Sequence, residues 1–345
     1  MYKIKFLLIM ILIIGQGCDT TEPTGDDKKP GKRNYAWTVD SVNSPGFPYL
    51  KSIWGSDPEN VWGAGFSEDV RDCLWHYDGI SWKRAAEGTP ITTSGNGSPI
   101  VGGVWGTAQD DVWAFGGRRF SSPERSESFI MHFNGTSWEE VYGNKENMPE
   151  GFRDIYPINK DHFWISSAPN VYEYNTGIWK KYFIGENFVI QSIEGIENDV
   201  YITAYQIGLD SLYIMKFESD NFLVVDQTNL LNNGKFAPNG LIIINNEMYT
   251  FGWEGIYSAK MSKEKVISDS WEQIVLTNNG GFSNSFLLSG NDIWAVGTNH
   301  FPYHFNGSSW HPIELRAEGY FFGIWGDGNE IFICDIENGK IYHGM

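Results

Sequence analysis

The chain has 345 residues, a formal net charge of −18 and an aromatic content of 16%, with 15 Trp, 17 Tyr and 22 Phe. Only 20% of the residues are charged, which excludes an acidic disordered chain. The negative charge argues against a nucleic-acid partner, because phosphate binding needs a basic face, and against electrostatic adhesion to anionic lipid. The length fits two average domains or one large all-β unit.

The first seventeen residues have the pattern of a secretory signal peptide. A basic start with Lys3 and Lys5 precedes residues 6–14, an apolar run that is shorter than the ~20 residues of a spanning helix. The segment ends in Gly17-Cys18, which resembles the lipobox of bacterial lipoproteins. The resemblance implies that residues 1–17 are removed, that Cys18 carries acyl chains such as palmitate, and that these anchor the protein to a bacterial membrane, at the outer membrane or cell surface. Ordinary secretion is the alternative.

The residues after Cys18 are rich in Pro, Gly and charge. Residues 18–34 are therefore expected to form a flexible tether, followed by a single domain over residues 35–345. The other cysteines, Cys73 and Cys334, belong to no CxxC pair. They predict neither a disulfide framework nor a zinc site, and we expect no metal and no cofactor.

A repeated unit dominates the rest of the chain. Its clearest copies are SIWGSDPENVWGAG from Ser52, GVWGTAQDDVWAFGG from Gly103 and LLSGNDIWAVG from Leu287, and weaker copies lie between them. One aromatic position recurs about every 45 residues, which is the period of propeller blades. Its residues are Trp62, Trp113, Trp164, Tyr201, Tyr249, Trp294 and Phe332.

Each unit is interpreted as four short strands, a to d. Asp78-Gly79, Asn134-Gly135 and Asn306-Gly307 predict two-residue turns between strands c and d. No helical periodicity is present, which excludes a helical solenoid. The sequence therefore predicts an all-β fold, a seven-bladed β-propeller of four-stranded blades. Six blades plus an irregular segment is the rival interpretation, because the fourth and fifth units are degenerate.

The seventh unit ends at strand c. Residues 35–39, YAWTV, look like a strand d without a blade of their own. We expect this N-terminal strand to pair with residues 340–344, to complete the last blade and to close the ring.

The Trp-rich pattern WG…DDVW…DGxSW resembles the repeat of bacterial secreted lipoprotein propellers and is similar to Asp-box, or BNR-type, propellers. In that family the motif is structural, so the resemblance implies a fold and no particular chemistry. We expect the repeated tryptophans to pack between blades and the acidic residues before each strand b to form turns. The tryptophans are Trp62, Trp82, Trp113, Trp138, Trp294 and Trp310.

Long, variable segments concentrate in the b–c and d–a connections, which share one face of a propeller, so that face is the predicted site. Arg118, Arg119 and Arg125 lie in the predicted loop 116–128, where they form an anion clamp or neutralise nearby acids. Tyr205, Trp253 and His300 also fall in or near b–c loops. An exposed ring there would stack on a sugar or a partner side chain, whereas Trp253 could instead be buried in the central channel.

The sequence contains no GxSxG, HExxH or GxxxxGK motif. We therefore expect a monomeric, non-catalytic binding or scaffold module for a glycan or a protein, held at the membrane by its lipidated N-terminus. The alternative is a glycan-active enzyme, a glycosidase or a glycosyltransferase-like protein, with carboxylates at the channel mouth.

Overall fold

The computed structural model describes most of the chain from Pro30 onward. The described residues are 30–42, 48–66, 73–85, 91–92, 98–121, 124–141, 149, 151–196, 199–229, 239–262, 265–267, 269–277, 280–315, 318–337 and 339–345. Some strand residues are described by their backbone alone, without their side chains. These are residues 91–92, 98–100, 118–121, 124–127 and 196.

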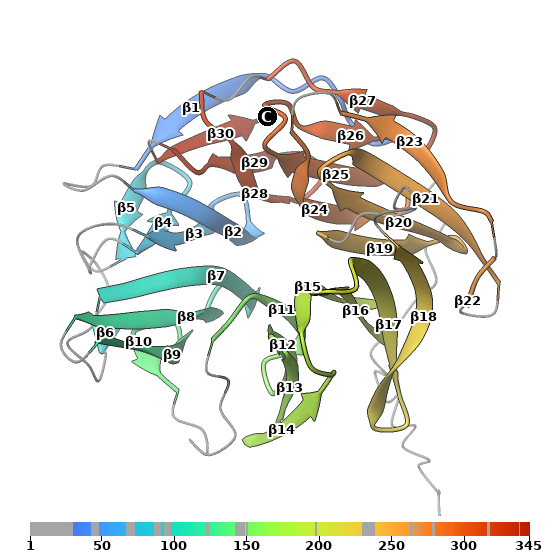
Figure 1. Ribbon diagram of the computed structural model, residues 1–345. Helices are drawn as coiled ribbons and strands as arrows, with labels where there is room; N and C mark the ends of the chain where they lie inside the picture. The colour runs from blue at the N-terminus through green and yellow to red at the C-terminus, as the bar shows by residue number, and fades with distance from the viewer. Residues whose placement is uncertain are drawn as a thin grey trace, which may run out of the picture.

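The described strands form seven sheets arranged around a central axis, along which Figure 1 looks, and all pairs are antiparallel except β6 with β10. Blade one holds β2 (Tyr49–Asp57), β3 (Asn60–Phe66), β4 (Leu74–Tyr77) and β5 (Trp82–Arg84). Blade two holds β7 (Ser98–Ala108), β8 (Asp111–Ser121), β9 (Glu124–Phe133) and β10 (Trp138–Glu140), with the short β6 (Ile91–Thr92) beside β10. Blade three holds β11 (Asp154–Asn159), β12 (His162–Ser167), β13 (Asn170–Asn175) and β14 (Ile178–Phe183).

The remaining blades repeat this order. Blade four holds β15 (Phe188–Ile196), β16 (Asp199–Gln206), β17 (Ser211–Glu218) and β18 (Asn221–Asn229). Blade five holds β19 (Gly240–Ile244), β20 (Glu247–Gly252), β21 (Gly255–Ser262) and β23 (Glu272–Leu276), with β22 (Lys265–Val266) beside β21. Blade six holds β24 (Phe282–Ser289), β25 (Asp292–Gly297), β26 (Tyr303–Phe305) and β27 (Trp310–Pro312). Blade seven holds β28 (Phe321–Gly326), β29 (Ile331–Asp335), β30 (Lys340–Gly344) and β1 (Trp37–Ser41). The seven-blade prediction is confirmed, and the six-blade alternative is wrong.

The predicted c–d turns are formed as their residue types dictate. In blade one, the Asp78 carboxylate accepts the amides of Ile80 and Ser81 at 3.1 and 3.0 Å, while Gly79 adopts φ of +82°. Asn134 and Asn306 make the same bonds in their own turns. A short acceptor followed by glycine therefore fixes the hairpin register in blades one, two and six.

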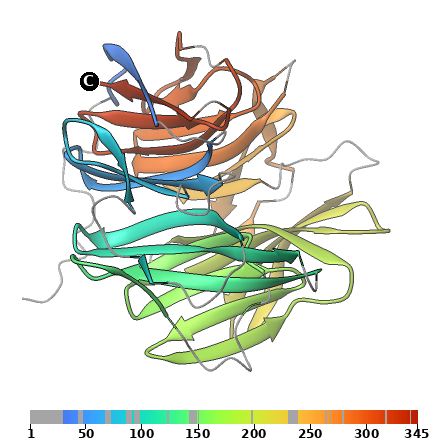
Figure 2. The ribbon, with the colours of Figure 1, turned by 90° about the vertical axis from the view of Figure 1, so that its left-hand side faces the viewer.

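The N-terminal strand closes the ring as predicted. Strand β1 pairs antiparallel with β30, with Trp37 opposite Gly344 and Ser41 opposite Lys340. Figures 1 and 2 both show the blue N-terminal strand lying along the red C-terminal strands. The seventh blade is thus built from both ends of the described chain, which leaves no blade with an unpaired strand c.

The closing segment also supplies a ring that blade seven otherwise lacks. In four other blades the last aromatic residue of strand c packs on the Trp opposite it in strand d, with ring centroids 5.0 to 5.5 Å apart; these pairs are Tyr77–Trp82, Phe133–Trp138, Tyr174–Trp179 and Phe305–Trp310. Blade seven has Gly344 at that place, and a Cβ added there would lie 2.9 Å from the Trp37 ring. Tyr35 fills the position instead, 5.7 Å from Trp37 and 5.8 Å from Trp294.

The repeated tryptophans form the core between blades. Trp138 and Trp294 are fully buried, Trp62 and Trp113 nearly so, and Trp82 and Trp310 are partly buried. The contact between blades one and two is representative, since Trp62 meets the edge of Trp138 with centroids 5.2 Å apart. Large flat rings fill the wedge between sheets at low entropic cost, so most of the Trp excess is structural.

Candidate functional site

The strand order gives each blade two different edges. The b–c and d–a connections lie at one edge, which we call the variable face, and the a–b and c–d turns lie at the opposite edge, the turn face. Of the candidate residues from the sequence, Trp253 and His300 lie in connections of the variable face, whereas Tyr205 lies in β16 and the three arginines lie in β8 and β9.

Trp253 is the most exposed aromatic residue on this face among the described residues, at 68%. It occupies the two-residue turn between β20 and β21. The turn is held by β23, because the hydroxyl of Thr277 donates to the Trp253 carbonyl at 3.2 Å and Gln273 donates to the Glu254 carbonyl at 2.9 Å. The backbone is therefore fixed while the indole stands in solvent, and burial in the central channel is excluded.

Exposed apolar side chains accompany Trp253 at the same edge of the neighbouring blades. Ile207 and Leu209 lie in the β16–β17 turn, Leu276 ends β23, Phe301 follows β25, and Tyr320 precedes β28. We call Ile207, Leu209, Trp253, Leu276, Phe301 and Tyr320 the apolar rim. Its residues belong to blades four to seven, and this succession of exposed apolar side chains at one edge makes the rim a candidate interaction surface.

His300 and Tyr205 support the rim. His300, at φ of +64°, contacts the Gly319 carbonyl through Nδ1 at 3.0 Å, and its ring lies 5.2 Å from that of Tyr320. The Tyr205 hydroxyl donates to Asp210 at 2.7 Å, a bond that raises the pKa of the phenol. Tyr205 thereby braces the turn that carries Ile207 and Leu209, and its ring packs on the core of blades four and five.

The three arginines lie in a different part of the ring. Residues 116–128 were predicted as a loop, but β8 and β9 continue through them as a long hairpin in which Arg118 pairs with Glu127 and Arg125 with Phe120. The arginine side chains lie outside the described residues. Blade two is three blades away from blades five and six, so the structure does not bring these arginines together with Trp253 and His300.

Two carboxyl groups lie close to the central axis on inner strands, Asp154 on β11 and Glu194 on β15. Burial, with the mutual repulsion of the two charges, raises the pKa of Glu194 well above its usual value, and burial raises that of Asp154 to about 6. Asp154 accepts the amide of Ile193 at 2.9 Å, and also the amide of Ile155. Its oxygens thus join blade three to blade four, which is a structural role.

The turn face carries a second recurrent arrangement, which the sequence analysis missed. A histidine on strand c contacts, through Nε2, a polar side chain at the start of strand b. The histidine ring also lies against the aromatic residue of strand b that comes two positions after this polar residue. The pairs are His76–Asn60, His132–Asp111, His304–Asp292 and His343–Glu330, at 2.5 to 2.8 Å. The ring centroids of histidine and aromatic residue are 4.0 to 4.3 Å apart.

The partners change in blades three and four, but the contact remains. His162 begins strand b and meets Glu173 of strand c at 2.9 Å, so the two residue types have exchanged places. Lys216 meets Asp199 at 2.8 Å in blade four. The residues before strand b, interpreted from the sequence as turn formers, therefore also join strands b and c. The signal was a recurring histidine in the WHY, MHF, YHF and YHG segments.

The other predicted features are placed as follows. Cys18 lies outside the described residues, whereas Cys73 and Cys334 are buried and are not joined by a disulfide. No group of three or more His, Cys, Asp or Glu side chains in the described part of the chain is arranged to hold a metal ion. None of the described residues belongs to a helix with the length and hydropathy that a membrane span requires.

Neither a protein-family model nor a curated protein matches the chain. Several solved structures are similar in fold. YCF48 bound to a D1 peptide shares 15% identity, with a TM-score of 0.61 over 92% of this chain and 99% of that one. The extracellular domain of a one-component system from B. thetaiotaomicron shares 13%, with a TM-score of 0.64 over 90% of this chain and 40% of that one. BamB from Moraxella catarrhalis shares 10%, with a TM-score of 0.52 over 86% and 85%. At these identities the likeness shows the fold, a β-propeller.

Proposed function

We propose that the protein is a lipid-anchored, extracytoplasmic propeller that binds a segment of a partner protein on its apolar rim and carries out no catalysis. The observation that supports this most is the rim itself, with Trp253 exposed on a turn whose backbone is fixed. A rigid scaffold that presents ordered side chains loses little entropy on binding.

The composition of the rim favours a protein over a glycan. Sugars stack on flat aromatic faces, whereas Ile207, Leu209 and Leu276 offer branched aliphatic surface that suits apolar side chains of a polypeptide. Asp210 and Glu254 stand in the same turns as rim residues, so the expected partner segment is apolar with basic flanks. Of the similar folds, YCF48 was solved with a bound peptide, which supports a peptide ligand, and the B. thetaiotaomicron domain is extracellular, which supports the extracytoplasmic location.

Of the residues singled out in the sequence, Trp253 is the proposed contact, and His300 and Tyr205 are positioning residues. The arginines of the blade-two hairpin are not part of the proposed site. Acylation of Cys18 would hold the propeller at the outer membrane or cell surface.

Selection from a random peptide display library on the full chain tests this proposal, with a glycan array run in parallel. We expect apolar, basic peptides to be selected. The variant Trp253→Ser/Leu276→Ser should bind these peptides at least about tenfold more weakly, because each of the two side chains contributes ~1–2 kcal/mol to binding. The matched control is Ile80→Ser/Ile178→Ser, which removes two exposed apolar side chains from the turn face. Equal binding by wild type and the rim variant would refute the rim as the site, and glycans retained in place of peptides would refute a protein partner.

A further inference from the structure

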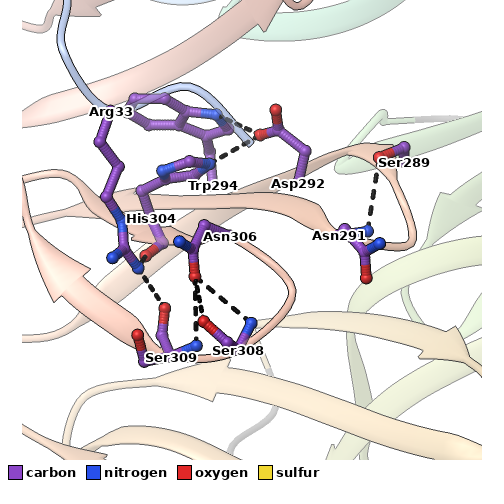
Figure 3. A network of polar contacts seen from close by, with 9 residues as sticks. All are labelled: Arg33, Ser289, Asn291, Asp292, Trp294, His304, Asn306, Ser308 and Ser309. Atoms are coloured by element: carbon purple, nitrogen blue, oxygen red, sulfur yellow. Dashed lines mark hydrogen bonds and ion pairs between the residues drawn. The ribbon is translucent and has the colours of Figure 1, made fainter. Parts of the chain in front are cut away.

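The residues just before the closing strand bind across blade six on the turn face (Figure 3). We call residues 30–34 the strap. The Gly31 amide donates to the Asn291 carbonyl at 3.3 Å, and Lys32 donates to the Asn329 carbonyl of blade seven at 3.1 Å. The Arg33 guanidinium donates to the carbonyls of His304, at 3.2 Å, and Ser309. The strap thus satisfies carbonyl oxygens of three turns.

The strap covers the His304–Asp292 pair, whose side chains are 0% and 7% exposed. Only glycine fits above this pair, because a Cβ on Gly31 would lie 2.7 Å from the Asp292 carboxylate and 2.8 Å from His304 Nε2. This blade-six groove therefore holds an extended segment of glycine, a basic residue and arginine.

Blade two has a matching arrangement, which we call the blade-two groove, with one difference: the Thr107 hydroxyl donates to the second oxygen of Asp111. His132 lies 2.6 Å from Asp111 and stacks on Trp113 at 4.2 Å, against 2.8 and 4.3 Å for His304, Asp292 and Trp294. The c–d turns also match, since Asn134 and Asn306 cap the same three donors and Gly135 and Gly307 share φ of +88°. The acceptor carbonyls that Arg33 uses on blade six consequently have counterparts at His132 and Ser137.

No described segment covers the blade-two pair as the strap covers that of blade six. His132 is 28% exposed and Asp111 14%. The surrounding positions are more acidic than in blade six, because Asp110 replaces Asn291, Asp161 replaces Asn329 and Glu139 replaces His311. Lys160, which precedes Asp161 in the β11–β12 turn, adds one positive charge. The blade-two groove therefore has matching turns and a stronger negative charge.

Blade one is a poorer match. Lys83 stands at the position of Glu139 and forms an ion pair with Asp78 of the c–d turn. A guanidinium placed there would meet a cation rather than a carboxylate. The charge pattern thus distinguishes blade two from its neighbour.

We propose that the blade-two groove binds an extended Gly–basic–Arg segment of a partner protein, in the way that Gly31 to Arg33 occupy blade six. This interface lies on the opposite face from the apolar rim and does not depend on it. Arginine is held by turn carbonyls and Glu139, the residue before it by Asp161, and the glycine sits on the His132–Asp111 pair. The charge of the groove complements such a segment.

The probe is a fluorescent peptide with the sequence of residues 30–35, PGKRNY, titrated onto the full chain at low salt and followed by anisotropy. We expect saturable binding that weakens at least about tenfold in Asp110→Lys/Glu139→Lys. The matched control, Glu59→Lys/Glu186→Lys, changes the net charge equally and alters blade one and the variable face. It should retain binding within about twofold.

A peptide with Gly31→Val should also bind at least about tenfold more weakly, because its side chain would clash with the His–Asp pair. Melting temperatures confirm that both protein variants are folded. The proposal is overturned by the absence of saturable binding, by equal losses in the two protein variants, or by binding that Asp110→Lys/Glu139→Lys leaves unchanged. The last result would place the peptide on blade six in exchange with the strap.

Discussion

The carboxylate of Asp292 accepts two donors at once, the indole of Trp294 and Nε2 of His304, each at 2.8 Å. In blade two, Asp111 makes the same contacts at 3.2 and 2.6 Å, but His132 remains partly exposed. The same three residue types thus form a buried site in blade six and a partly exposed site in blade two. Two differences separate the sites: the strap covers the pair in blade six, and the Thr107 hydroxyl donates to the second oxygen of Asp111 in blade two.

This contrast predicts different costs for the same substitution. Asp292→Ala should lower the free energy of unfolding by about 3 kcal/mol, because two buried donors lose their acceptor. Asp111→Ala should cost about 1 kcal/mol, since water can replace the carboxylate there. Urea unfolding of both variants measures the difference, and equal costs would contradict the role given to the strap.

A second prediction at this scale concerns Glu194 and Asp154, whose raised pKa values mean that the folded state holds their protons more tightly. Between the unfolded pKa near 4 and the folded value of about 6 for Asp154, the native state binds more protons. The stability contributed by these groups is therefore present below about pH 4 and is lost as the pH rises through that window.

Glu194→Gln removes the charge and should stabilise the protein by about 1 kcal/mol at pH 7, with little effect at pH 4. Urea unfolding at the two pH values tests this. Glu186→Gln, on an exposed turn, is the control and should change stability at neither pH. A destabilising Glu194→Gln at pH 7 would show that the carboxylate has a partner that depends on its charge.

At the scale of elements, β1 and the residues before it perform three tasks. The strand completes the blade-seven ladder, Tyr35 replaces the ring missing at Gly344, and the strap covers blade six. These contacts join the N-terminal segment to blades six and seven together. The ring is therefore closed by packing as well as by backbone hydrogen bonds.

Deleting residues 30–42 should lower the melting temperature by more than about 10 °C, because it exposes the edge of β30 and uncovers Trp294. A synthetic peptide of residues 30–42 added to the truncated protein should restore much of the loss by refilling the vacant edge. Calorimetry measures both effects. An unchanged transition after the deletion would refute closure by β1.

At the scale of the whole molecule, the two faces have different chemistry. The variable face carries the apolar rim, and the turn face carries the strap and the His–carboxylate pairs. The described chain begins at Pro30 on the turn face.

The anchor is tested by changing Cys18 to alanine. The wild-type protein should sediment with membranes and carry acyl mass, whereas Cys18→Ala should remain soluble without it. Cys73→Ala serves as the control, since Cys73 is buried in the propeller, and it should still sediment. A Cys18→Ala variant that stays with the membrane would disprove lipid anchoring.

The blade count, the c–d turns and the closing strand followed from the sequence alone, because each depends on a local pattern that repeats. Asp-Gly and Asn-Gly set the turns, one aromatic position marks strand b, and YAWTV resembles a strand d that has no other strands of a blade next to it in the sequence. The placement of Trp253 in solvent, the bracing of Tyr205 by Asp210 and the strand pairing of residues 116–128 did not follow. Each depends on contacts within one blade that no repeated motif marks, such as the pairing of β8 with β9 and the bond from Tyr205 to Asp210.

The same holds for the turn face. The strap was expected to be part of a tether, because Pro, Gly and charge give no local preference for a fold. Only closure of the ring places residues 31–33 against Asn291, His304, Ser309 and Asn329, so that carbonyl groups far away in the chain accept hydrogen bonds from Gly31, Lys32 and Arg33. Local hydrogen bonding and residue size determined the blades, whereas long-range packing decided what each face can bind.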